Sequence, residues 1–541
     1  MMNFLSKLWH GETRGLTMAA FIVGAASLAS AVVGVLRDRV LASTFGAGHV
    51  LDVYYAAFRV PDLIYGLVIV GSLSAGFIPV FAEYLETRPE REAWRLAENV
   101  LSVVGATMAF GCVILALLAP VVVPLTVPGF SPEQTDLTIR LSRIMFLSPF
   151  FLGMSAVMGG ILQATRRFIA FALAPVIYNL GIIFGALVLV PRIGMDGLAW
   201  GVVVGALLHF SIQASVALRL GLRRIPLPSL KEDGVLRILR LMAPRTAGLA
   251  VSQLNLVILL MFASTLPAGS VAVFNLANNL QSFPVNIIGI SFAVAAFPLL
   301  SQYASRKEAD VFSGVLVGTV KRILFLILPA TALLFLLRAQ AVRLVLGAGE
   351  FDWNDTIRTA TVLGVFLSAL VAQALVPLFA RAFYAVQNTW TPLWIGLACE
   401  ACNIVGAYFL RTSFGISGLA MSFAAATYLN LVLLIWQFRK RYRTYVADQW
   451  LKSGATSLIA SAAIIVAGYP VRQYIGSVFE LRTFWEVLLQ AGASGIVGVA
   501  AFIMVARLLH SPELEDFINT ARRKFLRKKL MIAGADEAQR T

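Results

Sequence analysis

VLRDRVLASTFGAGHVLDVYYAAFRVPD, residues 35–62, is the stretch around which the rest of this sequence is organised. Between two long apolar segments it holds six charged residues: Arg37, Asp38, Arg39, Asp52, Arg59 and Asp62. Ionisable groups at the depth of a bilayer are costly, and they persist mainly where they face a cavity or one another. The stretch therefore predicts a polar site inside a membrane protein.

The composition of the whole chain agrees with a membrane location. Of its 541 residues, 59% are hydrophobic and only 13% are charged, and the mean hydropathy is +0.82. Such a composition cannot supply the charged surface that a soluble domain needs. Gly15–Leu36 has no charged residue and is long enough, as a helix, to cross about 30 Å of hydrocarbon. The expected fold class is an all-α polytopic membrane protein.

Fourteen membrane-spanning helices are predicted from the apolar segments. They fall near residues 15–36, 51–82, 98–125, 137–163, 168–191, 195–220, 241–267, 271–303, 313–346, 357–386, 390–411, 415–438, 452–470 and 484–508. Basic residues gather in alternate loops, and the positive-inside rule places those loops and both termini in the cytoplasm. An even number of helices agrees with that orientation.

The formal net charge of +16 does not indicate nucleic-acid binding, because its positions follow the expected topology. Six basic residues crowd the tail after the last apolar segment: Arg522, Arg523, Lys524, Arg527, Lys528 and Lys529. Basic loops and tails of this kind set the orientation in the membrane and meet anionic lipid headgroups. Anionic membrane lipids are therefore expected partners, and nucleic acids are not.

An internal repeat organises the chain. ASTFGAGHVLDVYYAAF at 42–58 aligns without a gap to ASTLPAGSVAVFNLANN at 263–279, an offset of 221 residues. The same offset pairs Gly129-Phe130 with Glu350-Phe351 and Gly197-Leu198-Ala199 with Gly418-Leu419-Ala420. The repeat predicts two pseudo-symmetric six-helix halves, followed by two C-terminal helices. Because six is even, both halves cross the membrane in the same sense, a plan of transporters whose site lies between the halves.

The repeat and the charge pattern together predict five parts of the chain. They are an N-terminal half at 1–220, a cytoplasmic amphipathic linker at 221–240, a C-terminal half at 241–440, two further helices at 441–510, and a basic cytoplasmic tail at 511–541. The linker is expected to be an interfacial helix that joins the halves.

No catalytic or metal-binding pattern is visible in the sequence. It contains no GxxxxGK[ST] phosphate loop, no Ser-His-Asp set, and no histidine or cysteine pair with metal-ligand spacing. Cys399-x-x-Cys402 lies inside an apolar segment and is interpreted as two small residues on one helix. The expectation is a transporter, without enzymatic activity, metal or cofactor, whose driving force is a monovalent cation gradient or the membrane potential.

Intramembrane polarity supplies the candidate site residues. Those expected to bind an anionic headgroup are Arg37, Arg59, Arg245, Gln253, Asn255, Asn275 and Asn279; those expected to pair charges or act in gating are Asp38, Asp52 and Asp62; and Glu400 is the candidate for ion coupling. Arginine suits a phosphate because its planar fork donates two hydrogen bonds and its charge is permanent. The alternative is structural: the charges hold neighbouring helices together, and Glu400 makes a helix–helix hydrogen bond.

Several stretches resemble the MurJ (MviN) lipid II flippases, of the multidrug/oligosaccharidyl-lipid/polysaccharide exporter superfamily. They are SAVVGVLRDRVLASTFGAGHVLDVYYAAFRVPDLI, GSLSAGFIPVFAEY, VPGF, APVIYN, AFYAVQNTWTP and GAGEFD. The resemblance covers essentially residues 15–510, and the two helices beyond a twelve-helix core also fit it. It implies that these two helices, at 441–510, form a groove for the lipid tail. It departs from the family pattern at four places. Ala31 and Asn279 stand where the family has arginines, Tyr65 or Gly66 where it has a basic residue, and Val70 where it has an acidic one.

The resemblance implies a flippase in the bacterial cytoplasmic (inner) membrane. Its cargo would be undecaprenyl-pyrophosphate-linked disaccharide-pentapeptide, carried from the inner to the outer leaflet by alternating access, with arginines holding the headgroup. Other cell-wall synthesis proteins are candidate partners. The alternatives are a flippase or exporter of another polyprenyl-linked glycan or a small amphipathic molecule, and a non-transporting scaffold of wall synthesis.

Overall fold

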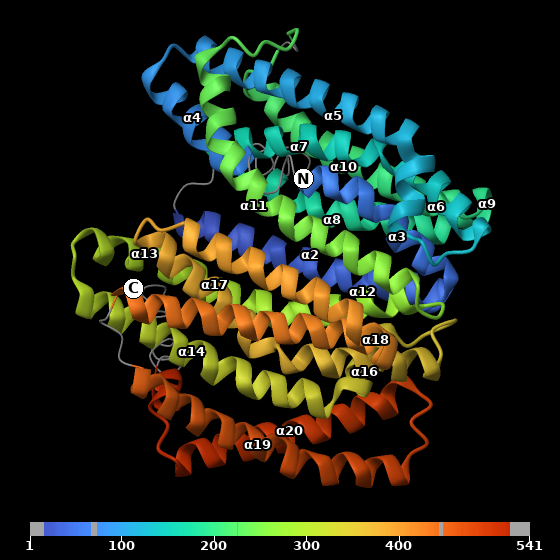
Figure 1. Cartoon of the computed structure of the whole chain (residues 1–541), viewed down its shortest axis with the longest axis vertical. Coiled ribbons are helices and arrows are strands. Elements are labelled where there is room, and N and C mark those ends of the chain that lie inside the picture. The colour runs from blue at the N-terminus through green and yellow to red at the C-terminus, as the bar shows by residue number, and fades with distance from the viewer. Residues whose placement is uncertain (1–15, 67–72, 224–225, 443–446, 520–541) are drawn as a thin grey trace, which may run out of the picture. The chain divides into compact units, whose positions relative to one another are not determined.

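The computed structural model describes residues 16–66, 73–223, 226–442 and 447–519, and throughout these segments the regular structure is helical (Figure 1). Within them, nine helices are long and apolar enough to span a membrane, or ten if the bent pair Trp353–Ser368 and Leu370–Ala385 is one span. In a helix the backbone N–H and C=O groups form hydrogen bonds with one another, and such bonds are needed in a bilayer because hydrocarbon offers no hydrogen-bond partner. The all-α class is confirmed, and the number of fourteen spans stays a prediction.

The chain divides into two compact units. Unit 1 comprises residues Met1–Leu276, Val345–Arg358 and Ile404–Leu419, and unit 2 comprises Ala277–Leu344, Thr359–Asn403 and Ala420–Thr541. Unit 1 thus contains the charged stretch 35–62 together with two short pieces of the later sequence.

Unit 1 is a bundle of the early helices. They are α2 (Leu16–Phe45), α3 (His49–Tyr65), α4 (Leu73–Thr87), α5 (Glu90–Thr126), α6 (Pro132–Met145), α7 (Leu147–Ala164), α8 (Phe168–Phe184), the π-helix η2 (Gly185–Leu189), α9 (Val190–Ile193), α10 (Asp196–Leu220) and α11 (Asp233–Ser264). Helix α10 packs on α7 and α8, and α2 packs on α8. A Cβ added at Gly181 of α8 would lie 2.3 Å from the Cα of Gly205 on α10, so these backbones approach as only small residues allow.

Most of the remaining helices belong to unit 2. They are η3 (Val285–Ile290), α13 (Ser291–Ser305), α14 (Ala309–Leu336), α17 (Leu370–Ala385), α19 (Ala447–Val478) and α20 (Phe484–Leu508). Helices α12 (Ser270–Pro284), α15 (Arg338–Leu346), α16 (Trp353–Ser368) and α18 (Trp390–Tyr442) have residues in both units.

The two C-terminal helices are tied to α14 inside unit 2. Figure 1 shows α19 and α20 side by side, and α14 packs on α19. Phe325 of α14 packs on Phe502 of α20, with ring centroids 5.6 Å apart. Arg472 of α19 donates a hydrogen bond to the carbonyl oxygen of Leu336, which closes α14. Large apolar side chains such as Val466 and Ile496 are nevertheless about three-quarters exposed, as expected of lipid-facing surface.

Several predicted spans are broken helices. The predicted helix at 137–163 is α6 and α7, which meet at Phe146, and the predicted helix at 271–303 is α12, η3 and α13. The predicted pair at 390–411 and 415–438 corresponds to the two parts of α18, which are separated by a kink at Gly415, where φ is 55°. Apolar content fixes where a span lies, whereas a break within it depends on the packing of its neighbours.

The linker also differs from its prediction. An interfacial helix was expected over 221–240, but residues 226–230 are not helical and α11 begins at Asp233 and continues without a break to Ser264. Glu98 and Asn99 of α5 hold the non-helical part: Glu98 accepts from the amide of Arg223, and Asn99 exchanges two hydrogen bonds with the backbone of Ser229. Buried polar side chains of α5 thus hold the linker in place, where an amphipathic helix had been expected.

The internal repeat is visible in the backbone. The amides of Arg166 and Arg167 bond to the carbonyls of Gln163 and Leu162, and 221 residues later the amides of Gln387 and Asn388 bond to those of Tyr384 and Phe383. Two pairs related by this offset also share positive φ: Arg166 with Gln387, and Gly194 with Gly415. Two pseudo-symmetric halves are therefore confirmed at the level of individual hydrogen bonds.

Candidate functional site

The C-terminal part of α2 carries a charge pair that α8 completes. Arg37 binds Asp38 through Nη2 at 2.7 Å and Nε at 3.0 Å, and its Nη1 donates to Oδ1 of Asn179 on α8 at 2.9 Å. Asp38 is 6% exposed. Asp38 thus forms an ion pair with Arg37, and all three guanidinium nitrogens of Arg37 are already in use.

Asn179 is a site residue that was not predicted. It belongs to the APVIYN stretch of α8, 142 residues from Arg37. Its own Nδ2 donates to the carbonyl oxygen of Pro175, one turn earlier, which fixes the amide with its oxygen toward Arg37. Asn179 is uncharged and lies in an apolar helix, so the charge pattern did not single it out. The local signal was Pro175, one turn earlier in the same helix.

Arg59 of α3 faces an amide instead of a carboxylate. Its Nη2 donates to Oδ1 of Asn275 on α12 at 3.2 Å, and Asn275 is held by a bond from its Nδ2 to the carbonyl of Val271. The Nε atom of Arg59 is buried and has no hydrogen-bond partner among the described residues. Two residues predicted from the sequence are therefore brought together, and the guanidinium keeps a donor free.

Asp52 joins the two repeats by capping a helix. Its Oδ2 accepts from the amide of Gly269 at 2.6 Å and its Oδ1 from the amide of Ala272 at 2.8 Å, at the N-terminus of α12. The residue is 3% exposed. A carboxylate is favourable at a helix N-terminus because it satisfies free amides and complements the macrodipole. Asp52 had been predicted to pair with a charge; its hydrogen-bond partners are backbone amides.

Asp62 lies one turn beyond Arg59 on α3 and lines a cavity that Arg59 does not line. A small cavity within unit 1 is bounded by Asp62, Tyr65, Ser148 of α7 and Val202 of α10. Among the described residues the structure records no ion pair for Asp62. Among the described residues, Asp62 thus makes no recorded ion pair with a neighbouring helix, and its recorded electrostatic interaction is with Arg59 of the same helix.

Four loop contacts, which we call the clasp, connect the repeats within unit 1. The amide of Glu350 donates to the carbonyl of Ser43, and the amide of Gly129 to Oγ of Ser264. At the start of α16, two further contacts hold the turns before α3 and α12: Oδ2 of Asp355 accepts from the amide of Ala47 at 2.8 Å, and Nη2 of Arg358 donates to the carbonyl of Ala268 at 2.9 Å. Glycine is required here, since a Cβ on Gly349 would lie 2.2 Å from the carbonyl oxygen of Ser43.

Three candidate site residues lie on α11, and the structure describes the side chains of two of them. Gln253 lies against the backbone of Gly66, with its side-chain amide where a Cβ on that glycine would project. Asn255 is 5% exposed. Arg245 is on α11, but its side chain lies outside the described residues.

The second half of α12 carries an amide network in unit 2. Gln281, 2% exposed, donates to Asn278 at 2.9 Å and accepts from Gln373 of α17 at 2.6 Å. Asn279 is exposed on the same helix, and Glu400 is half-buried on α18. Gln373 was not predicted. The headgroup role of Asn279 and the coupling role of Glu400 stay predictions.

The fold and this polar interior define a helical membrane transporter built on an internal repeat. Solved structures share the architecture: "Lipid II flippase MurJ, inward closed conformation" matches with a TM-score of 0.76 at 21% identity, over 92% of this chain and all of that one. A multidrug resistance MATE transporter of the MOP superfamily, in its inward-facing conformation, matches with a TM-score of 0.66 at 18% identity, over 76% and 94%.

Sequence relatives narrow the class to one family. A probable lipid II flippase MurJ from Bdellovibrio bacteriovorus is 30% identical over 508 residues, 91% of this chain and 93% of the relative. Another from Rhizobium tropici is 28% identical over 506 residues, 90% and 91% of the two chains. The family model "Lipid II flippase MurJ" matches residues 41–488. The chain belongs to the MurJ family, as its sequence motifs indicated, and is a multi-pass membrane protein of a transporter family.

Proposed function

We propose that this protein flips lipid II, the lipid-linked peptidoglycan precursor, from the inner to the outer leaflet of the cytoplasmic membrane. Family membership supports the cargo, and the internal repeat supports alternating access between two halves. The pyrophosphate-linked headgroup is anionic, so it requires a cation that a protein carboxylate has not already neutralised.

Arg59 is the residue that carries this proposal. Its one recorded side-chain bond is to the neutral amide of Asn275, its Nε atom is buried and unpaired among the described residues, and the Asp62 carboxylate interacts with its charge without a recorded ion pair. A guanidinium in that state has both charge and a donor to offer a phosphate oxygen. Arg37, by contrast, is engaged by Asp38 and Asn179 at every nitrogen. Arg59 therefore binds the headgroup, and Arg37 contributes after exchange of one of its present partners.

The clasp supports a state closed on one side. Its loops lie opposite the basic loops that the positive-inside rule assigns to the cytoplasm, so the closed side is the outer one and both termini are cytoplasmic. In this state lipid II enters from the cytoplasmic side, and release of the clasp opens the site outward. A monovalent cation gradient or the membrane potential, about 2.3 kcal/mol per charge per 100 mV, drives the cycle, with Glu400 as coupling carboxylate.

The test is a flipping assay in proteoliposomes with fluorescent lipid II, beside a second polyprenyl-linked glycan. Replacing both Arg37 and Arg59 with alanine is expected to lower lipid II flipping about tenfold or more, because each arginine–phosphate bond is charge-assisted. Arg482→Ala, in the exposed turn between α19 and α20, is the control. Unchanged flipping by the double variant would overturn the headgroup role. Equal transport of both glycans would favour the broader exporter, and inactivity of the unmodified protein would favour a scaffold that binds wall-synthesis proteins.

A further inference from the structure

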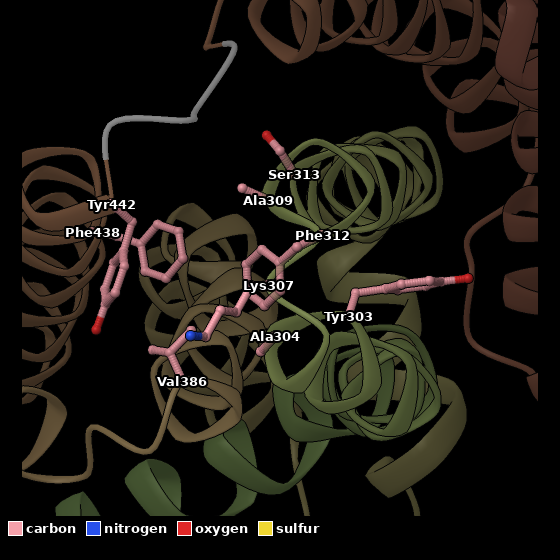
Figure 2. Close-up of a pocket in the computed structure, with 9 residues that line it drawn as sticks. All are labelled: Tyr303, Ala304, Lys307, Ala309, Phe312, Ser313, Val386, Phe438 and Tyr442. Atoms are coloured by element: carbon pink, nitrogen blue, oxygen red, sulfur yellow. The ribbon is translucent and has the colours of Figure 1, made fainter.

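A cavity of about 230 Å³ opens in unit 2 among the ends of α13, α14, α17 and α18 (Figure 2). It contains none of the candidate site residues. The turn between α13 and α14 that borders it carries Arg306 and Lys307, and belongs to the basic loops assigned to the cytoplasm. The cavity is therefore placed at the level of the inner-leaflet headgroups.

Among the described residues that line the cavity, Lys307 is the one that is charged. Figure 2 shows its side chain extending from the turn toward Val386, at the end of α17. For Lys307 no ion pair is recorded among the described residues. The acidic neighbours Glu308 and Asp310 are exposed and are not part of the lining. Within the described part of its lining, the cavity thus has an ammonium group whose charge is not compensated.

Backbone hydrogen bonds define the turn that carries Lys307. Its φ is +58°, a left-handed conformation that glycine adopts more readily. The amide of Lys307 bonds to the carbonyl of Ala304 and the amide of Glu308 to that of Tyr303, so the turn is the usual close of a helix such as α13. A glycine would make this turn with less strain, and a lysine there brings its ammonium to the cavity.

Two further features of α14 favour an anion. Ala309, Phe312 and Ser313 line the cavity from the first turns of α14, whose N-terminus has partial positive charge. Ser313 is 8% exposed, and its Oγ has no hydrogen-bond partner among the described residues. A buried hydroxyl without a partner is unfavourable, so an acceptor reaching it from the cavity would be stabilising.

Aromatic rings form the rest of the wall. Phe438 stacks on Phe312 with centroids 6.1 Å apart, and Tyr442 packs on Phe438 at 4.9 Å. Figure 2 shows Phe438 and Tyr442 across from Ala309 and Ser313. A small inorganic ion would leave this apolar wall uncovered.

We propose that this cavity binds an anionic glycerophospholipid of the inner leaflet, with its phosphate at Lys307, an ester oxygen at Ser313, and its glycerol and upper acyl carbons against Phe312, Phe438 and Tyr442. One uncompensated cation beside an aromatic wall matches an amphiphile with one phosphate. The site is separate from Arg37 and Arg59, so it does not depend on the identity of the flipped lipid.

The experiment uses the full-length protein in nanodiscs that contain phosphatidylglycerol or phosphatidylcholine. A photo-crosslinking benzophenone side chain replaces Ala309, which is exposed and lines the cavity. Val311, on α14 but outside the lining and 44% exposed, is the control position. Position 309 is expected to crosslink phosphatidylglycerol, and Lys307→Gln to lower the yield about fivefold, as one lysine near an anionic surface predicts. Gln387 adopts φ 59° in this chain, so glutamine fits the turn.

Arg306→Gln is the matched control, since it removes one charge from the same turn but not from the lining. It is expected to leave the yield unchanged, whereas Ser313→Ala lowers it about twofold. Four results would overturn the proposal: equal crosslinking of phosphatidylcholine, an equal loss with Arg306→Gln, full displacement by excess inorganic phosphate, or a crosslink to a peptide of this chain in place of lipid.

Discussion

The amide of Glu350 donates a hydrogen bond of 2.9 Å to the carbonyl oxygen of Ser43. Ser264 and Gly129, which the 221-residue offset relates to Ser43 and Glu350, make the corresponding contact in the opposite direction, at 3.3 Å. Each repeat therefore places a loop amide on the serine of the other repeat. A pseudo-twofold axis through the clasp would produce this reciprocal pair of hydrogen bonds. The two bonds together hold the loop of each repeat against the other repeat.

The clasp is expected to fail when a side chain enters it. Gly349→Ala adds a methyl against the Ser43 carbonyl and strains a residue at φ 54°, so it should favour opening on this side. A cysteine at position 43, in a chain whose three native cysteines are replaced by alanine, should react faster with an impermeant maleimide from outside when Gly349→Ala is added. Gly111→Ala, with open space around it, is the control and should not change the rate.

The Asp52 cap on α12 is expected to contribute more to the free energy of unfolding than a surface contact does. Asp52→Ala leaves two buried amides without acceptors and should lower the free energy of unfolding by about 1–3 kcal/mol. Asp52→Asn keeps one acceptor oxygen and should lose less. Denaturation in detergent measures both variants. If the two variants lost the same free energy, the negative charge and not the hydrogen bonds would hold α12.

Asn275 is expected to act as a positioning residue for Arg59. Asn275→Ala removes the one recorded partner of the guanidinium while leaving its charge, so the lipid II concentration for half-maximal flipping should rise several-fold with little change in the maximal rate. Asn275→Asp places a carboxylate against Arg59 and should lower flipping more strongly. A fall in maximal rate alone, with unchanged half-maximal concentration, would contradict positioning.

The ion pair between Glu83 and Arg237 gives a pH-dependent contribution to stability. It joins α4 to α11 at 2.9 Å, beyond the span predicted at 51–82, and the hydrogen bond from Arg237 lowers the pKa of Glu83 below its ordinary 4.5. Because the folded pKa is the lower one, the contribution is complete above the unfolded pKa and is lost as the pH falls through the folded pKa. The Tm of Glu83→Gln should be slightly below that of the unmodified protein at neutral pH, and the gap should close in acid. A gap that persisted in acid would indicate a packing effect.

The sequence by itself determined the membrane class, the two repeats, the family and the stretch where the charges lie. These follow from the length of the apolar segments, the constant offset of the repeat and the local motifs. Each can be recognised without knowing which helices pack together. Asp38 beside Arg37 was predictable for the same reason, because the partners are adjacent in the chain.

Only the tertiary structure decided which group each remaining charge meets. Asp52 caps a helix more than 200 residues away, Arg37 finds Asn179 on α8, and Arg59 finds Asn275 on α12. The sequence placed Asp52 and Arg59 in one charged stretch but identified a partner for neither of them. Hydrogen bonds depend on distances of about 3 Å between helices, and those distances are set by packing across the whole bundle.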